Sequence, residues 1–327
     1  MARPTSETRR AFAAALAAAA LAPGLVRAQD RFPRKAVRIV VPYTPGGFTD
    51  QIARVLGQKL GEAWKTTVIV ENRPGGGTVI GTDLVAKAPP DGHTLLLSGF
   101  AFAANASLHA RLAFDPLADF APVCLCASTP NLLVVNNDFP VRTVADLIAL
   151  ARSKPGQLTY ASAGPGSSPH LAMEWLKLET GIDLVHVPYK GSAPSIIDII
   201  GGRVPLSFDN TPNVIAHVRA GALRAIAVTS PRRFALMPQL PTIAETVPNF
   251  DVSSWFGLSA PARTPAPVVA AISEAVNRIL GLAEVRAQFR DQGVETVGGT
   301  PEQYGVHLRG QVARWARVVK SAGIAPQ

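Results

Sequence analysis

Two glycine-rich turns that also carry hydroxyl groups have the residue types most suited to binding chemistry in this sequence. One turn, residues 44–50, follows the apolar run Val37–Val41, and the other, residues 162–170, follows the apolar run at residues 158–161. Each turn leads into apolar residues at helical spacing. The first N–H groups of a helix lack acceptors within it, and the helix dipole favours negative charge there. Both turns could therefore bind an anion, and together they indicate two walls of one site.

The first turn is predicted to hold a ligand with the amides of Gly46, Gly47 and Phe48 and the hydroxyls of Thr44 and Thr49. A simpler interpretation is a tight turn in which Thr49 or the following aspartate only caps the helix. One glycine would be enough for such a turn. The run Pro45-Gly46-Gly47 has little side-chain bulk, which favours the close approach of a ligand.

The second turn holds more hydroxyls than a helix cap requires, at Ser162, Ser167 and Ser168. Ser168 as the N-cap, with Pro169 in the first helical position, would explain part of the pattern. His170 would follow on the first helical turn, where it could face either the site or the surface. We interpret the serines as ligand-binding and leave the role of His170 open.

Two further turns follow strands in the same part of the chain, at residues 188–193 and 209–211. Tyr189 or Lys190 could contact an anion. Asp209 could orient a water molecule or accept a hydrogen bond from an amine. Each of these residues could equally be a structural cap, so both interpretations stay open.

Several other kinds of site are not supported by the sequence. The glycines of residues 72–81 do not fit G-x-G-x-x-G, because Ile80 stands where the last glycine should be. The common serine-hydrolase, zinc-protease and S-x-x-K motifs are missing, and no two histidines have the i,i+4 spacing of metal ligands. Cys124 and Cys126 fit small buried residues better than a strained disulfide or a metal site. We therefore predict no catalytic residue, no cofactor and no metal.

Short strand-like runs alternate with helical patterns through most of the chain, which predicts an α/β fold with mostly parallel sheets and helices on both faces. The helical patterns include residues 49–60, Val144–Ser153, residues 169–180 and residues 194–200, of which the last ends at Gly201-Gly202, and a final helix over Pro301–Ser321. That last helix has an apolar stripe of Leu308, Val312, Trp315 and Val319, which is typical of a helix packed on a globular body.

The order of the elements predicts two lobes. Residues 121–135 and 250–261 form long extended stretches, and the α/β units between them look self-contained. We expect lobe 1 to comprise residues 29–129 and 253–327, and lobe 2 to comprise residues 130–252. The crossing segments near residues 127–131 and 251–256 would act as a hinge. Ligands of open α/β sheets bind beyond the carboxyl ends of the strands, so the two glycine-rich turns would face each other across a cleft.

The N-terminus has the pattern of an export signal. Arg9 and Arg10 precede an alanine-rich apolar run, and Val26-Arg27-Ala28 provides small residues at positions −3 and −1 of a cleavage site. The arginine pair fits a twin-arginine signal or an ordinary secretory signal. Without the four arginines and one glutamate of residues 1–28, the 32 basic and 23 acidic residues leave a net charge of +6. This modest, scattered excess and an aromatic content of 6% do not suggest a nucleic-acid partner.

Several motifs resemble the tripartite tricarboxylate transporter receptor family, also known as Bug-type periplasmic solute receptors. They occur in order along essentially the whole chain after residue 28. The matching residues are Pro45-Gly46-Gly47 with Thr49-Asp50, Val70-Glu71-Asn72-Arg73-Pro74-Gly75, Asp91-Gly92-His93-Thr94-Leu95, Val187-Pro188-Tyr189-Lys190-Gly191, Gly201-Gly202 and Phe208-Asp209-Asn210. The resemblance implies a two-lobed type II periplasmic-binding-protein fold that closes on a small carboxylate.

The resemblance also implies which residues bind the ligand. The first turn would hold the carboxylate and the second would close from the other lobe, while Asn105 and Ser107 match a polar turn of the first lobe and Asp209 matches a strand end of the second. The predicted ligand-binding residues are Thr44, Gly46, Gly47, Phe48, Thr49, Asp50, Asn105, Ser107, Ser162, Gly166, Ser167, Ser168 and Asp209. The run Phe100-Ala101-Phe102-Ala103-Ala104 is more apolar than the usual family pattern, which leaves room for an aromatic or longer-chain acid.

The sequence thus favours an exported, periplasmic solute receptor. It would act as a monomer and deliver an organic carboxylate to membrane transporter subunits or to a sensor. The alternative is a periplasmic α/β enzyme that acts on a carboxylated metabolite. Turnover distinguishes the two, because a receptor releases its ligand unchanged.

We expect cleavage after Ala28, because the small residues at 26 and 28 follow the apolar run. Mass spectrometry of the protein from a periplasmic extract should find Gln29 as the first residue. Soluble cytosolic protein that retains Met1 would contradict this expectation.

Overall fold

The computed structural model describes residues 32–321 and residue 323. The predicted signal peptide, residues 1–28, and its cleavage site lie outside the described residues. The chain divides into two units, Met1–Arg34 and Lys35–Gln327, and the second unit holds all the helices and strands that follow. None of the described helices is long and apolar enough to cross a membrane.

The first strand group is built on three parallel strands in the order β2-β1-β3. β3 pairs antiparallel with β9, β9 pairs with the first part of β4, and the short β10 also pairs with β4. The bounds of these strands are β1 Val37–Val41, β2 Val68–Asn72, β3 Thr94–Gly99, β4 Phe120–Val135, β9 Ser253–Pro261 and β10 Glu295–Thr296. The helices of this part are α2 Phe48–Trp64, α3 Val79–Ala86, α4 Phe100–Leu108, α9 Ala266–Leu280, α10 Ala283–Arg290 and α11 Pro301–Ser321, with a short 3-10 turn at Gly76–Thr78.

The second strand group uses the second part of β4, which pairs antiparallel with β7 and with β8. β5 lies parallel to both β7 and β6. The bounds of its strands are β5 Thr159–Ser162, β6 Val185–Pro188, β7 Leu206–Asn210 and β8 Arg224–Val228. Its helices are α5 Val144–Ser153, α6 Ser168–Thr180, α7 Ser192–Ile200 and α8 Thr211–Arg219, and a 3-10 turn spans Ile243–Glu245.

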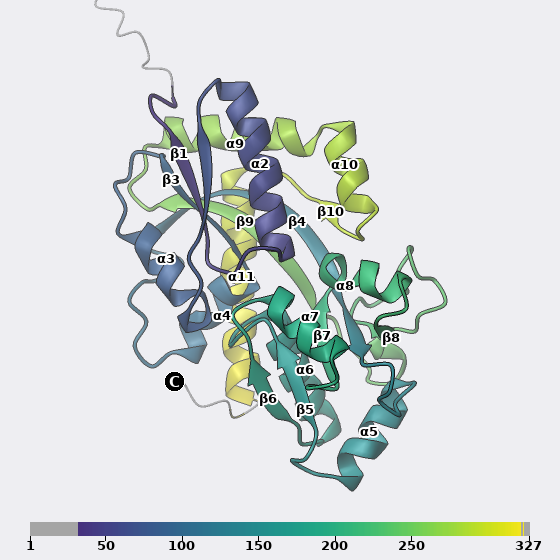
Figure 1. Cartoon of the computed structure of the whole chain (residues 1–327). Helices are drawn as coiled ribbons and strands as arrows, with labels where there is room; N and C mark the ends of the chain where they lie inside the picture. The colour runs from purple at the N-terminus through teal and green to yellow at the C-terminus, as the bar shows by residue number, and fades with distance from the viewer. Residues whose placement is uncertain (1–31, 322, 324–327) are drawn as a thin grey trace, which may run out of the picture. The chain divides into compact units, whose positions relative to one another are not determined.

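The long strand β4 connects the two groups, as Figure 1 shows. Its residues from Phe120 to Pro130 pair with β9, and its residues from Asn131 to Val135 pair with β7. The register along β9 shifts twice, so β4 carries irregularities before it reaches the second group. β4 runs from the first strand group into the second, and β9 returns beside it. The two strands therefore pair antiparallel.

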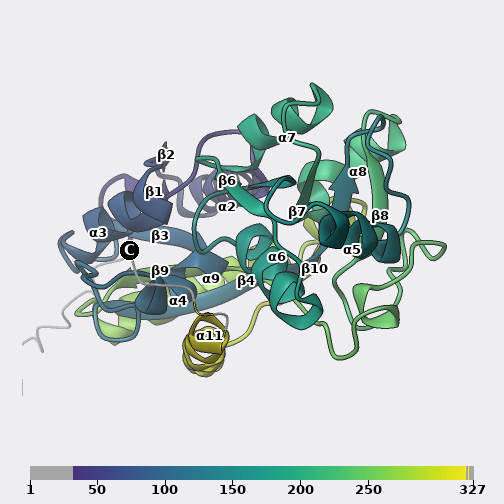
Figure 2. The same ribbon diagram turned by 90° about the horizontal axis from the view of Figure 1, so that it is seen from below.

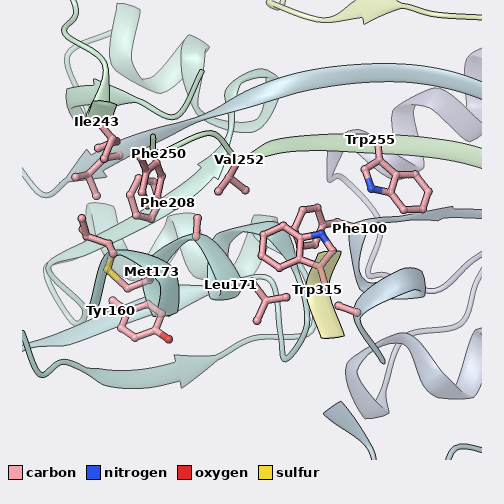
Figure 3. Close-up of a cluster of buried hydrophobic side chains, with 14 of the residues drawn as sticks. Phe100, Tyr160, Leu171, Met173, Phe208, Ile243, Phe250, Val252, Trp255 and Trp315 are labelled. Carbon is pink, nitrogen blue, oxygen red and sulfur yellow. The ribbon is translucent and has the colours of Figure 1, made fainter. Parts of the chain in front are cut away.

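Helix α11 packs against α4 and β4 (Figure 2). Aromatic side chains contribute to the hydrophobic core at this contact. The rings of Phe100 and Trp315 lie 4.4 Å apart, and Phe208 and Phe250 stack at 6.1 Å (Figure 3). The predicted stripe of α11 is confirmed, because its members are buried, fully or in part. They are Leu308, Val312, Trp315 and Val319.

Several local predictions are confirmed and several are wrong. Cys124 and Cys126 are buried free thiols, as expected. The expectation of mostly parallel sheets is wrong, because among the described strands four pairings are parallel and five are antiparallel, all five involving β4 or β9. Asn105 and Ser107 lie on helix α4 rather than in a turn, and Ser167, not Ser168, is the N-cap of α6.

Gly257 on β9 lies against the ring of Tyr304 from α11. A Cβ atom at residue 257 would come within 2.2 Å of the Tyr304 Cζ and hydroxyl oxygen, and that ring is fully buried. Gly310, further along α11, has no atom within 4 Å of such a Cβ. The two glycines therefore offer a matched pair of substitutions.

We predict that Gly257→Ala lowers the free energy of unfolding by about 1–3 kcal/mol, the usual range for overpacking. Gly310→Ala should instead raise it by up to about 1 kcal/mol, because alanine is the better helix former. Urea unfolding of both variants measures the difference. Equal stabilities would show that α11 moves away from β9 without penalty.

The rings of His170 on α6 and His186 on β6 are stacked, with their centroids 4.2 Å apart. Burial, together with the nearby Lys177 ammonium, lowers the pKa of His170 to about 4. Burial, together with the neighbouring His170, lowers the pKa of His186 to about 3. Both rings are therefore neutral in the folded protein at neutral pH, and the Gly166 N–H donates to His170 Nδ1 at 3.2 Å.

Because these pKa values are lower than in the unfolded chain, the unfolded state binds more protons as the pH falls below about 6.5. The protein should therefore lose stability from these groups as the pH falls from about 6.5 to about 3. His186→Gln removes one of them while keeping a polar group near the Ser162 hydroxyl, which lies 2.6 Å from His186 Nε2. Urea unfolding at pH 7 and pH 4.5 should show a smaller loss for this variant, and equal losses would contradict the prediction.

Candidate functional site

The N-terminal ends of five helices line one cavity of about 30 Å³. The helices are α2, α4, α6, α7 and α8, and β9 adds a further segment. The lining residues are Tyr43, Thr44, Gly47, Phe48, Thr49, Gly99, Phe100, Ala163, Ser167, Ser168, Pro169, Gly191, Ser192, Asn210, Asn213, Ser254, Trp255 and Phe256. This convergence follows from the topology, because each of these helices begins just after the carboxyl end of a strand or the turn that follows it.

The first wall is the start of α2, where Gly47 is the N-cap and Phe48 and Thr49 follow. Gly46 has a φ of +91°, so a glycine suits the turn, whereas Gly47 is extended with a φ of −82°. No heavy atom lies within 4 Å of a Cβ built on Gly47. Neither the backbone conformation nor the surrounding protein atoms therefore require a glycine at residue 47.

The second wall is the start of α6. The Ser167 hydroxyl donates to the Gly164 carbonyl oxygen at 2.6 Å and closes the turn. The Ser168 hydroxyl reaches Asn131 Oδ1 at 3.2 Å and Asn210 Oδ1 at 3.1 Å, and it also contacts the Ser254 hydroxyl. These contacts join α6, α8, β4 and β9 at the floor of the cavity.

The third wall comes from α7 and α8. Asp209, at the end of β7, is completely buried, and burial raises its pKa to about 6 although Asn213, Ser192 and the Asn210 amide all donate to it. Its Oδ1 accepts these bonds at 2.8, 2.8 and 2.7 Å. The second carboxylate oxygen, Oδ2, has no hydrogen-bond partner in the described structure. Asp209 therefore connects the start of α7 to the start of α8 without itself lining the cavity.

Two hydrogen bonds join the β1–α2 turn and the start of α2 to the segments that carry Lys190 and Asn213. The Thr44 N–H donates to the Lys190 carbonyl oxygen at 3.1 Å, and the Phe48 N–H donates to Asn213 Oδ1 at 2.8 Å. The Thr44 hydroxyl is buried and has no partner in the described structure. The opposing segments are close enough that a Cβ on Gly191 would lie 2.5 Å from that hydroxyl oxygen.

The charge of the site comes from the backbone. Among the described residues that line the cavity, none is Lys, Arg, His, Asp or Glu. None of the five helices has a hydrogen bond from its N-terminus to the side chain of its own N-cap residue. By contrast α5, which begins elsewhere, has a capping box formed by Thr143 and Asp146. Helix N-termini that their own N-cap side chains do not cap, together with the helix dipoles, thus give the cavity a positive potential that suits an anion.

Six of the predicted site residues line this cavity: Thr44, Gly47, Phe48, Thr49, Ser167 and Ser168. The carboxylate of Asp50 lies outside it and accepts from Arg54 Nε at 2.9 Å, Asn72 Nδ2 at 3.0 Å and the Gly46 N–H at 3.1 Å. Burial favours its neutral form, but these bonds outweigh burial and hold the pKa of Asp50 below its usual value. In this structure Asp50 stabilises the turn.

The other predicted residues also lie outside the cavity lining. They are Gly46, Asn105, Ser107, Ser162, Gly166 and Asp209. Asn105 Nδ2 donates to the Gly77 carbonyl oxygen at 2.8 Å and to the Thr78 hydroxyl at 3.1 Å. The Ser162 hydroxyl pairs with His186, as described above. These residues shape the turns, and their direct role in binding stays a prediction.

The polar lining residues that the sequence analysis did not assign are Ser192, Asn210, Asn213 and Ser254. In the turns at residues 188–193 and 209–211, the sequence pattern indicates Tyr189, Lys190 and Asp209 instead. A usable signal existed, since Asn210 is followed by Pro212 at the start of α8, in the same way that Ser167 is followed by Pro169 in α6. The described residues contain no group of three or more His, Cys, Asp or Glu side chains that could hold a metal ion.

Comparison with known proteins places this chain in a family. The model of the tripartite tricarboxylate transporter family receptor matches residues 52–324. The protein BugT of Bordetella pertussis is 37% identical over 297 residues, which cover 90% of this chain and 91% of that protein.

Solved structures agree with the sequence relatives. A structure of an R. palustris protein with adipate has a TM-score of 0.88 and 39% identity, and the match covers 91% of this chain and all of that one. MatC from Rhodopseudomonas palustris with bound malate has a TM-score of 0.85 and 31% identity, with 88% of this chain and 100% of that chain covered. The expected α/β periplasmic-binding-protein fold is confirmed. The chain therefore belongs to the tripartite tricarboxylate transporter receptor family, and it is a solute receptor rather than an enzyme.

Proposed function

We propose that this receptor binds a small organic carboxylate in the cavity lined by the five helix N-termini. The observation that carries the proposal is the concentration of backbone N–H groups and hydroxyls in a cavity whose described lining has no charged side chain. The related structures with adipate and with malate support the same class of ligand. In this scheme the amides of α2 and α6 bind the carboxylate from opposite sides.

The walls of the cavity also suggest the body of the ligand. Tyr43, Phe48, Phe100, Trp255 and Phe256 contribute aromatic residues to the lining. Of the apolar run Phe100–Ala104 that starts α4, Phe100 lines the cavity and the other four residues do not. A carboxylate with an apolar chain or ring suits these walls better than a small, highly hydroxylated acid.

We further propose that residues 29–129 with 253–327 and residues 130–252 act as two lobes that close on the ligand. The continuous run of β4 through both strand groups supports this division. On this scheme the protein is exported, works as a monomer in the periplasm, and hands its ligand to membrane transporter subunits or to a sensor. The description of related structures as a periplasmic transporter and a periplasmic binding protein supports that location.

Calorimetry with adipate and its uncharged counterpart adipamide tests the ligand class. Adipate should bind and adipamide should not, because only the carboxylate can use the helix N-termini as an anion does. Equal binding of the two compounds would overturn the proposed role of charge.

We predict that Gly47→Val weakens adipate binding at least tenfold, which corresponds to the loss of about one charge-assisted hydrogen bond. A Cβ at residue 47 has no protein atom within 4 Å and Gly47 has an ordinary extended backbone, so the variant should fold normally. Gly310→Val is the matched control, since it adds the same side chain where no atom lies within 4 Å. Calorimetry should find the control unchanged, and an unchanged affinity in Gly47→Val would move the site elsewhere.

A further inference from the structure

Asn213 provides the acceptor for a helix N-terminus that belongs to another part of the chain. The Phe48 N–H lies in the first turn of α2, where a helix offers no acceptor of its own. Its hydrogen bond goes to Asn213 Oδ1 at 2.8 Å, across 165 residues of sequence. An amide oxygen from α8 therefore occupies one of the N–H groups that we assign to the ligand carboxylate.

Two hydrogen bonds from its own amide nitrogen fix the orientation of the Asn213 side chain. Its Nδ2 donates to Asp209 Oδ1 at 2.8 Å and to the Ser192 hydroxyl oxygen at 2.9 Å. A carboxylate can only accept from the amide nitrogen, so the side-chain oxygen must point the other way. Asp209 and Ser192 thus aim the oxygen of Asn213 at the Phe48 N–H.

The cavity that this contact closes is small. Its volume is about 30 Å³, whereas pockets for small organic ligands usually measure about 300–1,000 Å³. The hydrogen bond from the Thr44 N–H to the Lys190 carbonyl oxygen is a second contact between the β1–α2 turn and the chain segment beside the start of α7. A dicarboxylate therefore needs the segment carrying Asn213 to move away from α2.

We propose that Asn213 is a built-in competitor of the ligand, whose amide oxygen takes the place of a carboxylate oxygen on the Phe48 N–H. This inference rests on the proposed carboxylate site. A carboxylate displaces the amide oxygen because a hydrogen bond to an ionised acceptor is roughly twice as strong as one to a neutral acceptor. The affinity for the carboxylate then depends on residue 213, because the ligand must first break the hydrogen bond between Asn213 and the Phe48 N–H.

Asn213→Ala tests the inference with two measurements on the full mature chain. In the ligand-free protein, hydrogen exchange of the Phe48 amide followed by NMR should become at least tenfold faster, because its acceptor is gone. Calorimetry with adipate and with malate should show binding about threefold to tenfold tighter, the range expected for the removal of one competing hydrogen bond. A side chain that only supports the fold would weaken binding when removed.

Asn136→Ala is the matched control. Asn136 Nδ2 also makes two hydrogen bonds, to the carbonyl oxygens of Ile199 at 2.8 Å and Ile200 at 3.1 Å. Asn136 directly follows the last residue of β4, and its side chain has no hydrogen bond to α2 in the described structure. It should change neither the Phe48 exchange nor the affinity. Unchanged Phe48 exchange in Asn213→Ala, or weaker or equal binding of an acid that the wild type binds, would overturn the inference and leave the carboxylate site standing. If neither acid binds to either protein, the proposed carboxylate site fails and the competition fails with it.

Discussion

The free N–H groups at the start of a helix are the constraint on which this site depends. Every helix begins with N–H groups that its own backbone cannot satisfy, and burying them without acceptors is unfavourable. In α5 the chain solves the problem locally, with the Thr143 and Asp146 capping box. At the cavity, the N-cap side chains of five helices form no such bond, and the Phe48 N–H of α2 instead donates to Asn213 of α8. The proposed binding site is thus a set of helix starts that their own N-cap side chains do not cap.

The topology explains why those helix starts meet. Each strand group carries helices that begin close to the carboxyl ends of its parallel strands, and β4 passes through both groups. β9 runs beside β4 and brings Ser254 to the floor of the cavity, where it joins Asn131 and Asn210. These hydrogen bonds join residues of β4, β7 and β9, so they connect the first strand group to the second. Movement of the two groups would therefore change the cavity directly.

Local patterns in the sequence predicted much of this fold. Val37–Val41, Val144–Ser153 and Pro301–Ser321 were predicted to the residue, because alternation, capping residues and an apolar stripe are all visible in short windows. Helix α4 was not predicted, since its residues from Phe100 to Asn105 are all buried and show no polar face. Six of the eighteen residues that line the cavity were found for the same local reason, in the glycine-rich turns that lead into α2 and α6. The meeting of Asn213 with Phe48 has no local signal, because it depends on how α8 packs across the cavity from α2.

A neutral site also suits a receptor that must release its ligand. An arginine would bind a carboxylate more strongly, but the departing ligand would leave a buried unpaired cation, which is strongly unfavourable. The N–H groups of Thr44 and Phe48 have substitute acceptors within the chain, so the ligand can leave without exposing an unsatisfied charge. In the proposed scheme, the affinity for a carboxylate is the difference between two sets of hydrogen bonds to the same donors. Substitutions among the neutral acceptors around the cavity can shift that difference while the carboxylate-binding backbone stays the same.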